Sequence, residues 1–161
     1  MSPQATPVPP GYHTITPHLV VSDTRKAVDF YKKAFGAEVR GIADGPGGKV
    51  MHAEIKIGDS IIMLNDEFPE WGVLAPTSTK AESSVTLHVY VPDADKVFEQ
   101  AQAAGCQVTM PLQDQFWGDR YGKLKDPFGH HWSVATHIKD LSPQEMKKAM
   151  DEAMAAMPSK S

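Results

Sequence analysis

Residues 18–39 read HLVVSDTRKAVDFYKKAFGAEV, and residues 88–108 read HVYVPDADKVFEQAQAAGCQV. The second stretch repeats the first, with His18 corresponding to His88 at a separation of 70 positions. A single deletion before Gly36 reduces the separation to 69. Repetition over such a length indicates two copies of one structural unit. Corresponding positions in the two copies are therefore the first places to look for chemistry.

Each copy has the pattern of a strand, a helix and three further strands. In the first copy, an apolar, β-branched run predicts a strand, and apolar side chains at helical spacing then predict a helix. The expected elements are a strand at 15–23, a helix at 24–35 and strands at 37–44, 49–58 and 60–66. The second copy repeats them as a strand at 84–93, a helix at 94–105 and strands at 106–114, 119–126 and 130–138.

The sequence thus predicts an α+β protein with two tandem βαβββ modules, which as copies of one unit are expected to build a cleft together, followed by a C-terminal helix. The boundaries follow from the Pro-rich beginning and from a Pro-, Ser- and Thr-rich stretch between the copies. We expect an extended N-terminal arm at 1–12, modules at 13–66 and 84–138, a linker loop at 67–83, and a C-terminal helix and tail at 139–161.

The predicted C-terminal helix begins with a capping box, formed by Ser142 and Glu145 with Pro143 at the first helical position. Its methionines fall on one face, which is more typical of a packing surface than of a cofactor site. Because this helix lies outside the repeat, we expect it to cover a module edge or a partner subunit, and we expect a homodimer.

Composition excludes several classes of function. The net charge of −4 and the pI of about 5.9 argue against a nucleic-acid partner, which requires a basic face. No run of 18 apolar residues is present, so a membrane span is not expected. The single cysteine, Cys106, permits no disulfide within the chain and fits a reducing cytoplasm. Its place after a glycine, at the corner between helix and strand, favours a buried thiol over a nucleophile.

Three segments resemble one known family. These are VSDTRKAVDFYKKAFGAEV at 21–39, HAEIKIGDSIIMLND at 52–66 and FWGDRYGKLKDPFGHHWSV at 116–134. Together they resemble the vicinal oxygen chelate superfamily, which contains glyoxalase I, extradiol dioxygenases, and fosfomycin- and bleomycin-resistance proteins. The third segment is most similar to the PhnB-like and drug-binding branches. The resemblance implies that the two modules form a curled mixed sheet around a shared cleft and, in metal-using members, that four ligands lie on the first and last strands of the modules.

The implied ligand positions fall on Thr16 and Thr86 in the first strands, and near Ile62 and on Ser133 in the last strands. None of these residues is a usual ligand for a catalytic transition metal. We therefore expect no metal cofactor and a protein that binds a small aromatic or amphipathic molecule, as bleomycin-resistance relatives do.

An alternative is a metal-dependent lyase, isomerase or dioxygenase with a shifted ligand set. Residues two apart on a strand share a face, so His18, His88 and His131 could converge on a divalent metal. Three histidines with an open fourth position can form a catalytic site.

The candidate ligand-binding residues are His18, His52, Trp71, His88, Phe116, Trp117, Tyr121 and Ser133. The repeat places both His18 and His88 on inward faces, although each could instead be a hydrogen-bonded core histidine. His52 shares a strand face with Glu54, either as solvent-facing residues or as an acid–base pair. The aromatic residues suit planar or cationic ligands, with packing under a loop or a dimer contact as the alternative. The turn beginning at Asp126 is expected to be structural only.

Overall fold

The computed structural model describes residues 4–159, so residues 1–3 of the arm predicted at 1–12, and residues 160–161 of the predicted tail, lie outside the described residues. The α+β class and the tandem modules are confirmed. Module one contains β1 (His18–Val21), α1 (Thr24–Phe35), β2 (Glu38–Asp44), β3 (Val50–Ile57) and β4 (Ser60–Asp66). Module two contains β5 (Thr86–Tyr90), α2 (Ala94–Ala104), β6 (Gln107–Asp114), β7 (Asp119–Lys125) and β8 (His131–His137).

Short helical turns and one further helix complete the fold. Single 3-10 turns lie between β2 and β3 and in the segment between the modules, at η1 (Pro46–Gly48), η2 (Pro69–Trp71) and η3 (Pro76–Ser78). The chain then ends in α3 (Pro143–Ala156).

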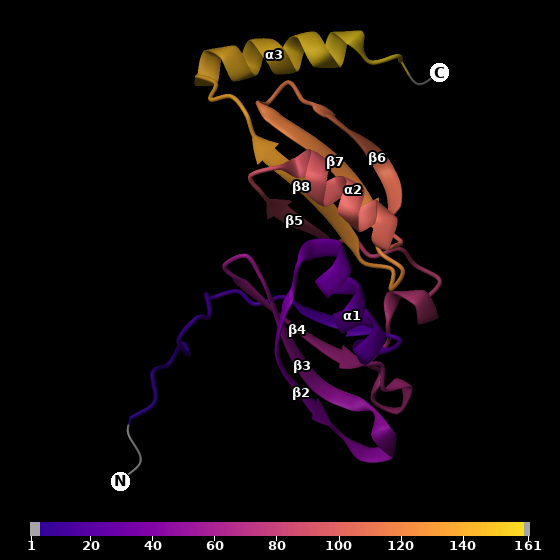
Figure 1. The fold of residues 1–161 in the computed structure, drawn as a ribbon. Coiled ribbons are helices and arrows are strands. Elements are labelled where there is room, and N and C mark those ends of the chain that lie inside the picture. The colour runs from indigo at the N-terminus through magenta and orange to yellow at the C-terminus, as the bar shows by residue number, and fades with distance from the viewer. Residues whose placement is uncertain (1–3, 160–161) are drawn as a thin grey trace.

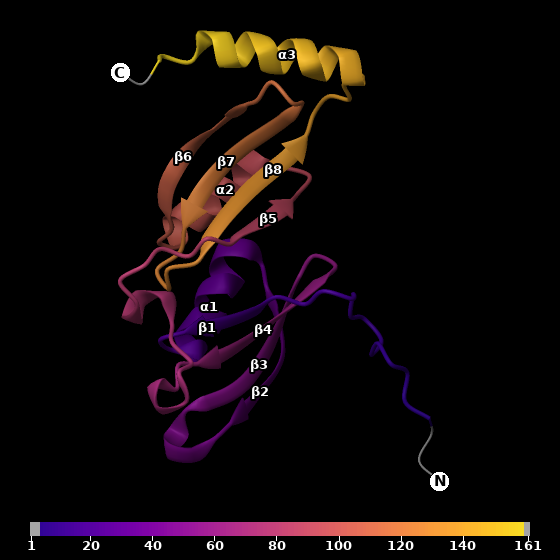
Figure 2. The same cartoon turned by 180° about the vertical axis from the view of Figure 1, so that it is seen from behind.

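In the described part of the chain the strands form two four-stranded sheets with the same topology. The strand order is β1-β4-β3-β2 in module one and β5-β8-β7-β6 in module two. The first strand of each module runs parallel to the last, and the other pairs are antiparallel. The modules are stacked along the long axis of the molecule, with α1 beside module two (Figure 1) and β1 and β5 on the facing edges of the two sheets (Figure 2).

Capping interactions set the ends of the two helices in the repeat, α1 and α2. The Asp23 carboxylate accepts a hydrogen bond from the Lys26 amide at 3.1 Å, which caps the start of α1. Gly36 then ends α1 with φ of 66°, in the left-handed region that glycine adopts without strain. Asp93 caps α2 in the same way, through the Lys96 amide.

The two modules share one hydrophobic core. The Tyr31 hydroxyl on α1 donates a hydrogen bond at 2.6 Å to the Asp126 carboxylate of module two. The indole of Trp132 donates to the same carboxylate at 2.8 Å, and the Phe128 ring packs beside Tyr31. Asp126 is buried, and it also accepts from the amides of its own turn. The prediction that this turn is structural is confirmed, and it additionally joins the modules.

Helix α3 lies across the end of module two that is farthest from module one (Figures 1 and 2). The predicted capping box is present, with Ser142 and Glu145 each bonded to the other's main chain. None of the helix's residues, all of which are described, is buried, and Met154 is 61% exposed. Among the described residues, no helix has the length and apolar character needed to span a membrane.

Candidate functional site

Each sheet has one face covered by its own helix and one open face. In module one, Leu19 and Ile55 belong to the covered face and are buried in the core. His18 alternates with Leu19, and it pairs in register with Met63 of β4, which in turn pairs with Glu54 of β3. His18, Met63 and Glu54 therefore lie on the open face.

The open face of module one carries a polar cluster. His52 and Glu54 lie within hydrogen-bonding distance on this face, with 3.1 Å between His52 Nε2 and Glu54 Oε1. The rings of His18 and His52 meet edge to face, with their centroids 6.0 Å apart. Arg40 Nε lies 3.6 Å from Glu54 Oε2. Hydrogen bonds from Tyr12 and then from His52 lower the pKa of Glu54, so this carboxylate is ionised at neutral pH.

In module two the same positions carry different chemistry. His88 corresponds to His18, and its Nδ1 lies 2.7 Å from the buried Ser133 hydroxyl. Tyr121 stands where module one has His52, and its ring stacks on His88 with a centroid separation of 5.8 Å. Burial lowers the pKa of His88, an effect that the charge of Asp119 partly opposes. His88 is therefore neutral at neutral pH.

Five rings of module two contact one another in a row, which we call the aromatic wall: His88, Tyr90 and Tyr121 from its strands, and Phe116 and Trp117 from the loop before β7. Centroid separations along it are 5.1 Å for Phe116–Trp117, 5.2 Å for Trp117–Tyr121, 5.8 Å for Tyr121–His88 and 4.4 Å for His88–Tyr90. The sequence predicted four of these rings as ligand-binding residues. It missed Tyr90, although Tyr90 lies two residues after His88 on the same strand, and this spacing places both on one face.

Asp119 is a further residue of this site. It is only 4% exposed and lies behind the aromatic wall. Its carboxylate accepts hydrogen bonds from the Tyr90 hydroxyl at 3.0 Å and from the Trp117 indole at 3.1 Å. Its other oxygen lies 2.8 Å from His137 Nδ1. Its sequence neighbour Arg120 pairs instead with Asp95 and Asp114.

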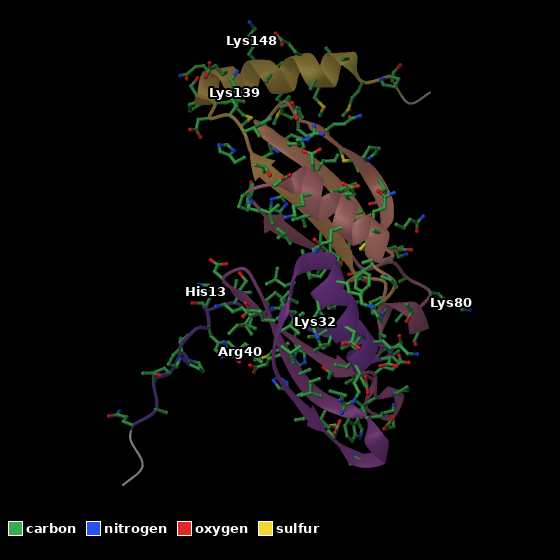
Figure 3. The ribbon with its side chains drawn as sticks, in the orientation of Figure 1. His13, Lys32, Arg40, Lys80, Lys139 and Lys148 are labelled. Carbon is green, nitrogen blue, oxygen red and sulfur yellow. The ribbon has the colours of Figure 1, made fainter. Side chains whose placement is uncertain are left out.

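A cavity of about 820 Å³ lies between the modules and meets the aromatic wall. Module one contributes the segment before β1, the β3–β4 hairpin and Phe35. Module two contributes residues 87–91, so that His88 and Tyr90 belong both to the wall and to the cavity. In Figure 3, His13, which also lines the cavity, lies on the N-terminal segment at the side of module one. The lining is largely apolar, with Phe35, Ile57, Ile61, Leu87, Val89 and Trp132 among its members.

The structure does not bring every candidate to this site. Trp71 is 61% exposed and stacks on Phe68, with the ring centroids 4.9 Å apart. Lys49, the residue before β3, places its ammonium group over the Phe68 ring. Phe68 and Trp71 therefore lie near the start of β3, whereas the cavity lies at the β3–β4 hairpin, where β3 ends. Phe116 additionally borders a smaller cavity of about 410 Å³ beside α3.

The three histidines of the shifted ligand set lie in separate surroundings. His18 packs against His52, His88 against Ser133 and Tyr121, and His131 Nε2 lies 3.0 Å from Glu82. Within residues 4–159, no group of three or more His, Cys, Asp or Glu side chains is arranged to hold a metal ion.

The ligand positions implied by the resemblance are refined by the strand register. Ser133 pairs with His88 on the open face, and the residue that pairs with His18 in the same way is Met63. Ile62, the position expected from sequence, pairs with Ile55 and is 5% exposed in the core. Cys106 is also buried, and burial raises the pKa of its thiol to about 12, so it stays protonated.

Comparison with known proteins identifies a matching family, related sequences and similar structures. Residues 11–134 match the family model described as the Glyoxalase/Bleomycin resistance protein/Dioxygenase superfamily. An uncharacterised protein of Mycobacterium bovis is 44% identical over 139 residues, which cover 84% of this chain and 91% of that protein. The crystal structure of TioX from Micromonospora sp. ML1 matches with a TM-score of 0.61 and 27% identity, covering 78% of this chain and 99% of TioX.

A fosfomycin resistance protein shares the fold at much lower sequence similarity. FosX from Listeria monocytogenes, crystallised with Mn(II) and sulfate, matches with a TM-score of 0.60 at 14% identity. The match covers 83% of this chain and 95% of FosX.

Proposed function

The chain belongs to the Glyoxalase/Bleomycin resistance protein/Dioxygenase superfamily, and from this premise we propose that it binds a small aromatic or amphipathic molecule between its two modules. The observation that carries the proposal is the continuity of the aromatic wall with the 820 Å³ cavity through His88 and Tyr90. This volume falls within the range of about 300–1,000 Å³ that is usual for small-molecule sites.

The chemistry of the lining supports a planar, largely apolar ligand. Phe35, Leu87 and Trp132 provide apolar area, while His88 and Tyr90 supply a few polar atoms that could orient the ligand. A mostly apolar pocket with a small number of convergent polar groups is typical of sites for small organic molecules. Aromatic rings add offset-stacked or edge-to-face contacts with a flat ligand.

The residues at the superfamily's metal-ligand positions favour a ligand that is held by side chains rather than through a metal ion. The positions that correspond to the superfamily's ligands carry Thr86, Met63 and Ser133 on the open faces and Thr16 in the segment before β1, at the cavity. Hydroxyls and a thioether are poor ligands for the divalent metals that histidine and carboxylate bind. The residues present therefore do not fit such a metal, and we propose no metal-dependent step.

Three naphthalenes of different charge provide the test. We expect at least one of 1-naphthylmethanol, 1-naphthylmethylammonium and 1-naphthoate to raise the melting temperature and to bind measurably by isothermal titration calorimetry. The variant Tyr121→Ala should weaken that binding about tenfold, since it deletes a ring from the wall, and tenfold corresponds to about 1.4 kcal/mol.

The matched control is Trp71→Ala, which removes an exposed aromatic ring away from the wall and should leave the dissociation constant unchanged. The proposal fails if none of the three compounds binds, and a rise in the melting temperature of the untagged protein with Mn²⁺, Ni²⁺ or Zn²⁺ would then favour a metal site. It also fails if Tyr121→Ala and Trp71→Ala weaken binding equally.

A further inference from the structure

Asp119 is only 4% exposed, and its carboxylate accepts hydrogen bonds from two rings of the aromatic wall. We propose that Asp119 is a positioning residue that holds Tyr90 and Trp117 in the orientation in which the ligand meets them. The inference rests on the proposed function, because it assigns a role to Asp119 only if the wall binds a ligand. It goes further by identifying what gives the wall its shape.

The need for such a residue follows from the exposure of Tyr90. Its side chain lies at the edge strand β5 and is 62% exposed, with its ring against His88. A ring so exposed is free to change rotamer unless its hydroxyl is held. The Tyr90 hydroxyl donates to Asp119 Oδ2 at 3.0 Å, and the Trp117 indole donates to the same oxygen at 3.1 Å. One carboxylate oxygen therefore fixes two rings that come from different elements.

Asp119 is itself held rigidly. The preceding residue, Gly118, has φ of 99°, and its carbonyl accepts hydrogen bonds from the amides of Ile138 at 2.9 Å and Lys139 at 3.0 Å. Strand β7 begins at Asp119 and pairs it in register with His137 of β8. His137 Nδ1 lies 2.8 Å from Asp119 Oδ1, and His137 Nε2 lies 2.8 Å from Asp140.

The charges around this group are consistent with an ionised carboxylate. Burial acts to raise the pKa of Asp119, but hydrogen bonds from His137, Tyr90 and Trp117 lower it overall. Asp140 and then Asp119 raise the pKa of His137. The titratable groups that face Asp119 are thus His137, Tyr90 and, through its charge, His88, with Asp140 on the far side of His137.

Preorganisation gives the expected size of the effect. A side chain that is already ordered does not lose its rotamer entropy when the ligand binds, and for each side chain this saving amounts to a several-fold change in affinity. Releasing both Tyr90 and Trp117 should therefore weaken binding about tenfold. We expect this loss in Asp119→Ala, measured with whichever naphthalene binds the wild type most tightly. The control Asp114→Ala removes an exposed partner of Arg120 on the neighbouring strand and should change the affinity less than twofold.

A double-mutant cycle separates positioning from general damage to the fold. If Asp119 acts through the two donors, Asp119→Ala should cost less than twofold in a Tyr90→Phe/Trp117→Phe background, where neither donor remains. A purely structural role would instead lower the affinity by the same factor in both backgrounds.

The conservative variant Asp119→Asn adds a pH readout. In this variant a side-chain NH₂ group replaces one carboxylate oxygen. When His137 is neutral, its Nδ1 can accept a hydrogen bond from that NH₂ group. The amide oxygen then remains free to accept from Tyr90 and Trp117. When His137 is protonated, both of its nitrogens donate, so the amide turns and presents N–H groups to the two ring donors. We therefore expect the affinity of Asp119→Asn to fall several-fold as the pH drops through the pKa of His137, while that of the wild type changes little.

The outcomes distinguish the two proposals. If the wild type binds none of the three naphthalenes, the proposed function fails, and this inference fails with it. If the wild type binds but folded Asp119→Ala binds equally well, the inference is overturned and the proposed function stands. If Asp119→Ala does not fold, Tyr90→Phe decides: it should weaken binding several-fold, and unchanged affinity together with a pH-independent Asp119→Asn would overturn the inference.

Discussion

At the scale of single residues, the two modules keep the same positions and differ in their chemistry. His18 and His88 occupy corresponding places on the open faces. Beside His18 lies His52, bonded to a carboxylate, whereas beside His88 lies Tyr121. One face is therefore polar and charged, and the other is aromatic.

Two histidines of module two should titrate on opposite sides of the ordinary value of about 6.5. Burial lowers the pKa of His88, whereas hydrogen bonds to Asp140 and Asp119 raise the pKa of His137. Proton NMR titration, with His88→Gln and His137→Gln to assign the signals, measures both midpoints. Finding the midpoint of His88 above that of His137 would contradict the structure.

The signs of the corresponding stability effects follow by linkage. His137, with its raised folded-state pKa, stabilises the fold below the unfolded pKa, and this contribution is lost as the pH rises through the folded value. His88, with its lowered pKa, opposes folding increasingly as the pH falls below the unfolded value. Urea unfolding of wild type and His88→Gln at a series of pH values measures the second effect: the stability advantage of the variant should grow toward acidic pH.

At the scale of elements, similar caps serve helices with very different burial. Asp23 caps α1, a helix that buries Ala27, Phe30 and Tyr31, while Ser142 caps α3, which buries none of its residues. Loss of either cap removes a hydrogen bond worth about 1 kcal/mol to its helix. The consequence for the whole protein should nevertheless differ, because only α1 is part of the core.

We expect Asp23→Ala to lower the free energy of unfolding by about 1 kcal/mol, since α1 cannot fray without opening the core. We expect Ser142→Ala to leave that free energy within about 0.5 kcal/mol of wild type and to speed hydrogen exchange only over the first turns of α3. Chemical denaturation and hydrogen–deuterium exchange test the pair, and a larger loss of global stability from Ser142→Ala would contradict this account.

At the scale of the whole molecule, the shared core makes the modules dependent on each other. The buried cluster runs from Val28 and Phe30 of module one to Phe98 and Trp132 of module two. The Tyr31–Asp126 hydrogen bond crosses the same boundary, and burial followed by the charge of Asp126 raises the pKa of Tyr31 well above its ordinary value. His130 Nε2 also lies 2.9 Å from the Val20 carbonyl. The modules should therefore unfold together.

Tyr31→Phe tests this coupling. The variant removes one donor from the buried Asp126 carboxylate, and a hydrogen bond to a charged group contributes about 1.5–3 kcal/mol. We expect that loss in a single unfolding transition, with far-ultraviolet circular dichroism and tryptophan fluorescence giving the same midpoint. Separate midpoints for the two probes, or protected amides in one module after the other has unfolded, would show that the modules fold independently.

Much of the fold could be predicted from the sequence because its signals are local or periodic. The helix bounds of α1 and the capping box of α3 depend on hydrogen bonds between residues three or four apart. The repeat then transfers each assignment from one module to the other. The candidate site was predicted less completely: His88, Tyr121 and Trp117 were found and lie together, Trp71 lies elsewhere, and Tyr90 was missed.

The sequence by itself therefore determined the duplicated βαβββ order, the helix ends and the open-face positions of His18 and His88, because strand alternation and capping are encoded within a few neighbouring residues. Only the tertiary structure decided which side chains meet across long separations. Asp119 reaches Tyr90 across 29 positions, His88 reaches Ser133 across 45, and Tyr31 reaches Asp126 across 95. Such contacts depend on strand register and on how the modules dock, because both are set by the packing of the whole core rather than by any short segment.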